Sequence, residues 1–232
     1  MNPNTLDQRS ASIFLTLLVC GDLAFVLLHL VNDSTTRLMN PLLSLEKDRG
    51  YAEMYQYLKF LWIILLLILV SLRKASWGYV LWASVFAYLL ADDALQVHER
   101  VGMAIAENFG LAPALWLRPQ DHGELAVSLA AGTILFAPLA WAYGTGTRAF
   151  RKSSLDFALL LGLLIFFGVG VDMAHVALGL GGPFDFAAGV IEEGGEMLAV
   201  SLILGYAFLI AIRDGDAHHH LFDSVRDFMA RR

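Results

Sequence analysis

The stretch FAAGVIEEGGEMLAVSLILGYAFLIAI, residues 186–212, decides how the rest of the chain is interpreted. Its length and its apolar composition predict a helix that spans a membrane. Three acids interrupt it, Glu192, Glu193 and Glu196, and carboxylates inside a span are costly, so they usually face a protein interior and mark function. Spacings of three and four residues place these side chains on one face of the helix. The rest of the chain must supply groups that offset this charge.

The composition of the whole chain is that of a polytopic helical membrane protein. Of its 232 residues, 57% are hydrophobic and 16% are charged, and the apolar residues come in long blocks rather than in alternation. The single cysteine, Cys20, excludes a disulfide or a thiolate metal site within one chain. The net charge of -6 comes without a basic cluster, so we expect no nucleic-acid partner. The first apolar block lacks a small-residue cleavage site and is expected to remain in the membrane.

The apolar blocks predict an all-α integral membrane protein with six transmembrane helices. We place them at roughly residues 12–31, 51–72, 76–99, from 119 onward, 155–178 and 186–212. The connection of residues 100–118 is apolar but interrupted by Gly110 and Pro113, and we expect it to lie along the membrane interface. Residues 1–212 form a single transmembrane domain in this interpretation, and residues 213–232 form a polar cytoplasmic tail.

The basic residues predict the orientation of the chain in the membrane. Six spans place both termini and two short loops on one side, and ten of the sixteen Lys and Arg residues fall there. These ten are Arg9, Arg73, Lys74, Arg148, Arg151, Lys152, Arg213, Arg226, Arg231 and Arg232. Under the positive-inside rule, this side is the cytoplasm. We therefore expect a cell membrane of the bacterial inner-membrane type, with both termini cytoplasmic.

Acidic residues on four of the spans fall at one depth in this topology. Asp92 and Asp172 lie roughly 24 and 25 Å up two helices that rise from the cytoplasmic side, at 1.5 Å per residue. Glu124 opens the fourth span, and the acids of residues 192–196 lie in the first turns of the sixth. The inner halves of these spans carry almost no charge. The pattern predicts a polar site inside the outer half of the bundle.

We expect this site to hold metal, most simply two divalent or redox ions. The pattern contains nine acids, namely Asp92, Asp93, Glu99, Asp121, Glu124, Asp172, Glu192, Glu193 and Glu196. Like charges in a poorly solvated site cannot all ionise, so cations or protons must offset them. Carboxylates with a minority of imidazoles and no thiolate are typical of iron, manganese or zinc. Asp172 and His175 form a carboxylate-x-x-His pair of the kind that di-metal helical bundles use.

The candidate metal ligands come from four spans and the segments that flank them. They are Asp92, His98, Glu99, Asp121, His122, Glu124, Asp172, His175, Glu192, Glu193 and Glu196. In a hydrolytic reaction the expected general base toward metal-bound water is Glu193 or Glu124. The tract His218 to His220 resembles a metal-binding sequence, but a solvated tail is the simpler interpretation.

Several other residues are open to more than one interpretation. Asp22 and His29 on the first span fit a supporting role at the site and an ordinary interhelical hydrogen bond equally well. Lys59 is either a counter-charge for the acids or a side chain that snorkels outward. Gly194 and Gly195 should let a neighbouring helix approach closely.

Three classes of function are compatible with an acidic site near the outer surface. The first is a metalloenzyme that hydrolyses or oxidises a lipid or another amphiphile, since headgroups lie at this depth. The second is a divalent-cation or proton transporter, although the inner halves of the spans are nearly uncharged and no inverted repeat is visible. The third is a non-catalytic subunit that senses metal or pH. The arrangement is similar in kind to di-metal carboxylate bundles and membrane zinc hydrolases, without a matching motif, and leaves the oligomeric state open.

Overall fold

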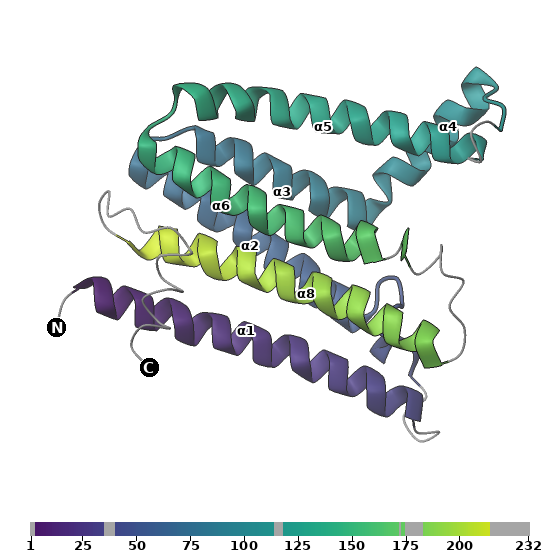
Figure 1. Ribbon diagram of the computed structural model, residues 1–232, viewed down its shortest axis with the longest axis horizontal. Helices are drawn as coiled ribbons and strands as arrows, with labels where there is room; N and C mark the ends of the chain where they lie inside the picture. The colour runs from purple at the N-terminus through teal and green to yellow at the C-terminus, as the bar shows by residue number, and fades with distance from the viewer. Residues whose placement is uncertain (1–2, 35–39, 114–117, 172, 175–182, 214–232) are drawn as a thin grey trace.

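The computed structural model describes residues 3–34, 40–113, 118–171, 173–174 and 183–213, and it is helical throughout its regular elements (Figure 1). In chain order these elements are α1 (Pro3–Ser34), η1 (Pro41–Leu43), α2 (Tyr51–Lys74), α3 (Gly78–Leu95), α4 (Val97–Phe109), α5 (Pro119–Thr145), α6 (Arg148–Ile165), η2 (Phe166–Val171) and α8 (Pro183–Ile212). Among the described residues, six helices are long and apolar enough to cross a membrane: α1, α2, α3, α5, α6 continued by η2, and α8. The prediction of a six-helix membrane protein is confirmed at this level.

The helix that carries the three acids, α8, lies at the centre of the bundle, between α1, α2 and α6 (Figure 1). In its most apolar stretch 72% of the residues are buried, against 11% in α5. It runs antiparallel to α1, because the rings of Phe14 and Phe208 lie 4.5 Å apart at one end and those of His29 and Phe186 lie 5.1 Å apart at the other. The acids of α8 are therefore surrounded by other helices rather than presented to lipid along its length.

Aromatic rings form the core between α3, α6 and α8. Phe157 of α6 is fully buried and lies 5.4 Å from Trp82 and 5.0 Å from Tyr206, measured between ring centroids. Their polar atoms are satisfied: the Trp82 indole donates to Ser154 Oγ at 3.0 Å, and the Tyr206 hydroxyl donates to Asp156 at 2.5 Å. Since lipid tails are as apolar as these rings, the core gains stability from close packing and hydrogen bonds rather than from removal of water.

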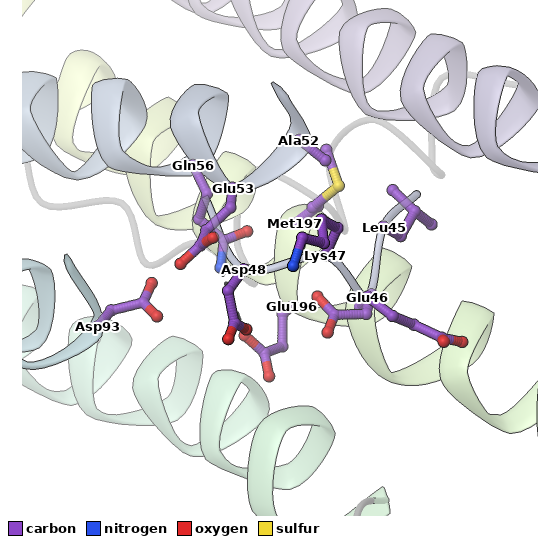
Figure 2. A pocket seen from close by; sticks show the side chains of 11 residues that line it. Leu45, Glu46, Lys47, Asp48, Ala52, Glu53, Gln56, Asp93, Glu196 and Met197 are labelled. Atoms are coloured by element: carbon purple, nitrogen blue, oxygen red, sulfur yellow. Dashed lines mark hydrogen bonds between the residues drawn. The ribbon is translucent and has the colours of Figure 1, made fainter. Parts of the chain in front are cut away.

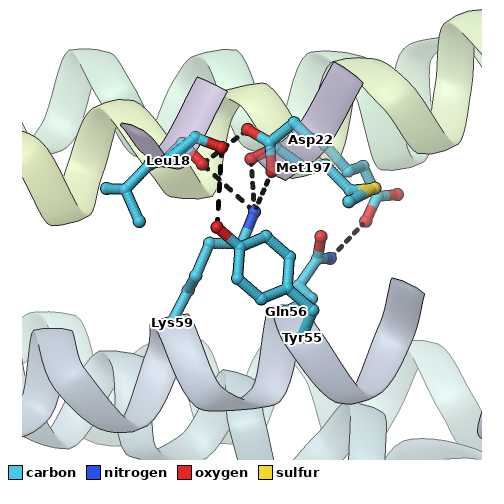
Figure 3. Close-up of polar contacts among 8 residues, drawn as sticks. Leu18, Asp22, Tyr55, Gln56, Lys59 and Met197 are labelled. Carbon is cyan, nitrogen blue, oxygen red and sulfur yellow. Dashed lines mark hydrogen bonds and ion pairs between the residues drawn. The ribbon is translucent and has the colours of Figure 1, made fainter. Parts of the chain in front are cut away.

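A buried ion pair ties α1, α2 and α8 together. The ammonium of Lys59 is fully buried and donates to Asp22 Oδ1 at 2.9 Å, to the Met197 carbonyl at 2.8 Å and to Ser201 Oγ at 3.2 Å (Figure 3). The Ser201 hydroxyl donates to the second Asp22 oxygen at 2.6 Å. Lys59 therefore does not snorkel, and the acid that it neutralises is Asp22 rather than an acid of the predicted site.

The third span ends earlier than predicted, and the difference matters for the site. We expected a helix to Glu99, but α3 ends at Leu95 and Gln96 adopts a left-handed conformation with φ of 53°. The chain then turns into α4, which runs at an angle to α3 and packs along the start of α5 (Figure 1). Val101, Met103 and Phe109 of α4 are exposed, in keeping with the expected interfacial helix.

Candidate functional site

Two adjoining cavities occupy the end of the bundle where α2 and α8 begin and α3 ends, within the part of the chain that the structure describes. The larger, about 150 Å³, is called the acidic cavity here (Figure 2). Six carboxylates line it, together with Lys47 and Gln56: Glu46, Asp48, Glu53, Asp93, Glu193 and Glu196. Figure 2 labels all of these carboxylates except Glu193 and shows that they come from different segments of the chain. The smaller cavity, about 100 Å³, shares Asp48, Glu53 and Asp93 with it.

The connection between α1 and α2 forms one wall of the acidic cavity because it folds back onto the bundle. The Asn40 side chain accepts a hydrogen bond from the Leu42 amide at 3.1 Å and starts the turn η1. Leu45 is then buried against Ala52 and Met197. This anchoring leaves the next three residues, which carry two of the acids, at the cavity.

The acids of α8 are held from two sides. Glu196 accepts a hydrogen bond from the Gln56 side chain at 3.3 Å, and its carboxylate lies against Gly168 of η2, where a Cβ atom would collide with it. Gly195 likewise leaves room for the ring of Phe167. The prediction that a glycine here admits a neighbouring helix is confirmed for Gly195. A Cβ on Gly194 would meet only a methyl of Val26, at 3.6 Å.

The helix break after Leu95 pairs Asp92 with His98. Asp92 Oδ1 accepts the backbone N–H of His98 at 2.8 Å, and Asp92 Oδ2 lies 2.9 Å from His98 Nδ1. When Nδ1 donates to the carboxylate, the lone pair of Nε2 is left for a proton or a metal. Both residues line the smaller cavity together with Glu99. In an unbroken helix His98 points away from Asp92, so the break creates this pair.

The predicted ligands at the start of α5 lie elsewhere, at the contact between α4 and α5. Asp121 accepts hydrogen bonds from the Arg118 guanidinium, at 2.9 Å for the shortest, which raises the pKa of Arg118. Glu124 accepts from the Gln120 side chain at 2.6 Å and packs against Gly102 of α4. His122 sits between them on the same helix. These side chains belong to a helix contact that glycines make close, and the acidic cavity is lined by other residues.

The structure brings together some of the predicted site and leaves other parts open. Glu193 and Glu196 line the acidic cavity, whereas Glu192, on the same helix, is half-buried outside its lining. Asp172 and His175 lie outside the described residues, as does the tract of residues 218–220. Within the described residues, no group of three or more His, Cys, Asp or Glu side chains has a geometry that could hold a metal ion. The metal site therefore stays a prediction.

Three acids that line the acidic cavity were missed as candidates by the sequence reasoning: Glu46, Asp48 and Glu53. Glu53 belongs to the first turn of α2, where its carboxylate accepts hydrogen bonds from the Arg49 amide and the Tyr57 hydroxyl. Acids in a loop that folds back onto the bundle have no depth along a span, so their position cannot be predicted from residue counts along the helices. A cluster of three acids within eight residues before and at the start of a span was the available signal.

Comparison with known protein families gives one match. The model of a family described as a domain of unknown function, DUF8692, matches residues 11–210. The chain belongs to the DUF8692 family. No curated protein and no solved structure matches it. For this DUF8692 member, the matched region contains four of the candidate spans entirely, most of the first and the last, and all residues that line both cavities, so the site lies within the family domain.

Proposed function

We propose that this DUF8692 member is a membrane-embedded metalloenzyme that acts on the headgroup region of a lipid or another amphiphile. The observation that carries the proposal is the Asp92–His98 pair beside the acidic cavity. A carboxylate that orients an imidazole is the arrangement that supports histidine as a metal ligand or a base. Here the imidazole of His98 lines the smaller cavity, and the smaller cavity shares Glu53 and Asp93 with the acidic cavity.

The charge in the acidic cavity supports a cation as its occupant. Six carboxylates line it and Lys47 is the one basic side chain among its lining residues. Glu46, Asp48 and Asp93 are exposed, whereas Glu53, Glu193 and Glu196 are half-buried, and half-buried carboxylates that share one cavity repel one another unless cations or protons offset their charge. A divalent ion, with iron, manganese and zinc as candidates, offsets two charges and uses several oxygen lone pairs at once. Side-chain rearrangement on binding is required, because the described side chains do not form a closed ligand set.

The proposed reaction is hydrolysis or oxidation with Glu193 as the general base. A bound divalent ion would supply a hydroxide near neutral pH, or oxygen chemistry if it is redox-active. Glu193 lines the same cavity as Glu196, Glu53 and Asp93, so it can take a proton from a water held among them. We assign no catalytic role to Glu124, since it lies at the α4–α5 contact.

The proposed substrate follows from where the cavity lies along the bundle. The basic residues of α2 and α6, Arg73, Lys74, Arg148 and Arg151, are at the opposite end of the helices from the acidic cavity. With the positive-inside orientation, the cavity is at the outer surface of a cell membrane, with both termini in the cytoplasm. Lipid headgroups and carbonyls lie at this depth, which favours an amphiphilic substrate.

Metal analysis of the purified protein tests this proposal. The protein is loaded separately with Mn²⁺, Fe²⁺ or Zn²⁺ in detergent, washed, and its bound metal measured by mass spectrometry. We expect one or two ions per chain, reduced strongly in Glu193→Gln and Glu196→Gln. The matched control is Glu107→Gln on the exposed side of α4. A protein that folds normally and holds no metal under any loading contradicts the proposal.

Transport of a cation or proton is a second candidate, favoured by the polar network beneath the cavity. Met197 lines the acidic cavity and its carbonyl accepts from Lys59, so the buried Lys59–Asp22–Ser201 group adjoins the cavity floor (Figure 3). These hydrogen bonds extend the polar contacts from the cavity toward the membrane centre, where the sequence predicts few charged residues. Uptake of radioactive Mn²⁺ and internal pH change in proteoliposomes separate the candidates. Uptake that exceeds empty vesicles, and that disappears in the double variant Asp22→Asn, Lys59→Met while this variant stays folded, favours transport.

A further inference from the structure

We propose that His29 is a pH-responsive latch, which holds the segment of residues 45–49 at the acidic cavity when neutral and releases it when protonated. The structural part of this inference is independent of the proposed function. Its effect on cation affinity rests on the proposal that the acidic cavity binds a divalent ion. His29 itself is not part of the cavity lining.

His29 is a buried residue near the C-terminal end of α1, and it connects three segments. It is 4% exposed, and its ring stacks on Phe186 of α8 with centroids 5.1 Å apart and planes 13° apart. Its Nδ1 accepts the backbone N–H of Leu45 at 3.2 Å, a bond that is itself buried. The ring therefore fixes the position of Leu45 relative to both α1 and α8.

This hydrogen bond requires a neutral imidazole. Nδ1 can accept from an amide only through its lone pair, so the ring proton is on Nε2. Nε2 is buried and has no hydrogen-bond partner in the part of the chain that the structure describes. A protonated ring donates from both nitrogens and needs an acceptor at each. At Nδ1 it would instead face the Leu45 N–H, so the two donors must separate.

Charged groups lie on every element that packs around His29. The titratable and charged groups on the nearby parts of these elements include Asp22 and Asp33 on α1, Glu46, Lys47, Asp48 and Arg49 in the connection, Glu53, Tyr55 and Lys59 on α2, and Asp185, Glu192 and Glu193 on α8. Lys59 is occupied by Asp22. The Glu46 carboxylate lies against Gly189, one turn along α8 from Phe186. The Glu46 carboxylate is thus placed on the face of α8 that Gly189 shares with Phe186, the residue that stacks on the His29 ring.

Release of Leu45 changes the acidic cavity directly. Leu45 lines the cavity, and the three residues that follow it contribute two of the six carboxylates and the lysine. Leu45 is otherwise held only by apolar packing on Ala52 and Met197. Apolar packing is non-directional, so it does not fix the orientation of the Leu45 backbone. When the hydrogen bond is lost, the wall formed by residues 45–49 moves relative to Glu193 and Glu196, and the charge density of the cavity falls.

The latch is tested by NMR and amide exchange on the full-length protein in nanodiscs, from pH 8 to about pH 5, where histidines titrate. We expect ¹⁵N signals of a neutral, Nε2-protonated ring at pH 8, and imidazolium signals together with lost protection at Leu45 and Glu46 as the pH falls. His29→Asn places a non-titrating oxygen near the position of Nδ1, so Leu45 should stay protected at every pH. His29→Phe keeps the stacking and removes the acceptor, so protection should be low throughout.

Two results would overturn the latch. One is a ring that titrates while the protection of Leu45, corrected for the intrinsic pH dependence of exchange, stays constant. The other is a pH response in His29→Asn that equals that of the wild type. A second experiment measures Mn²⁺ affinity. Acid weakens this affinity in every variant, because it protonates the carboxylates of the cavity. Acidification should weaken wild-type binding on the order of fivefold more than binding by His29→Asn. If Mn²⁺ binds neither to the wild type nor to His29→Asn, the proposed function is contradicted, and the amide-exchange experiment still tests the latch.

Discussion

The ammonium nitrogen of Lys59 lies 2.9 Å from Oδ1 of Asp22, and both side chains are almost completely enclosed by α1, α2 and α8. All three N–H donors of the ammonium and both carboxylate oxygens have partners. A charge pair in this environment contributes most through what happens when one member is lost. It also connects the floor of the acidic cavity to the helix that carries the latch.

Lys59→Met should therefore destabilise the protein strongly. It leaves the Asp22 carboxylate without its counter-charge, at a cost of about 3–5 kcal/mol. The double variant Asp22→Asn, Lys59→Met removes both charges and should recover a large part of this loss. Thermal unfolding in detergent measures both. Arg100→Met, at an exposed position of α4, is the control and should change the unfolding temperature little. Equal loss in the single and double variants would contradict this account.

The two adjacent glycines of α8 should respond oppositely to alanine. At Gly195 a Cβ would overlap the ring of Phe167, so Gly195→Ala should destabilise the η2–α8 contact by about 1–3 kcal/mol. At Gly194 a Cβ has room, so Gly194→Ala should be neutral or stabilise by up to about 1 kcal/mol through helix propensity. Unfolding of each variant in a denaturing detergent series gives the comparison. If the order is reversed, α8 does not pack as described.

Asp92→Asn should weaken metal binding although Asp92 need not touch the metal. The amide can no longer hold His98 with its Nδ1–H toward a carboxylate, so the tautomer that presents the Nε2 lone pair is lost. Removing such an orienting partner typically costs 10–100-fold in metal affinity, and we expect about tenfold here. Competition with a fluorescent chelator measures it. An unchanged affinity would show that His98 is not a ligand.

Asp121→Asn and Glu196→Gln distinguish the predicted ligands that the structure separates. Asp121 is engaged by Arg118 at the start of α5, and Glu196 lines the acidic cavity. We expect the first variant to retain the metal content of the wild type and the second to lose most of it, as measured on the purified proteins. Loss of metal in Asp121→Asn would bring the start of α5 back into the site.

The acidic cavity shows how far depth along a helix can locate a site. Asp92, Asp93, Glu193 and Glu196 do gather at one end of the bundle, as counting residues along alternating spans predicts. Glu124 lies at a similar depth but at another helix contact. Depth gives only the position of a residue along the helix axis. To share a site, two residues must also lie on neighbouring helices and on the faces that these helices turn toward each other. Glu46 and Asp48 were overlooked for the complementary reason, since they reach the site from a loop.

The sequence by itself determined that this is a six-span helical membrane protein, that α8 carries acids within a span, and that basic residues gather at the opposite end. These features follow from apolar length and charge position, which act locally along the chain. Only the tertiary structure decided that Lys59 neutralises Asp22, that Asp92 orients His98, and that His29 holds Leu45. Each of these contacts depends on a helix break, a folded loop or a neighbouring helix, and such arrangements follow from side-chain packing between distant segments rather than from local periodicity.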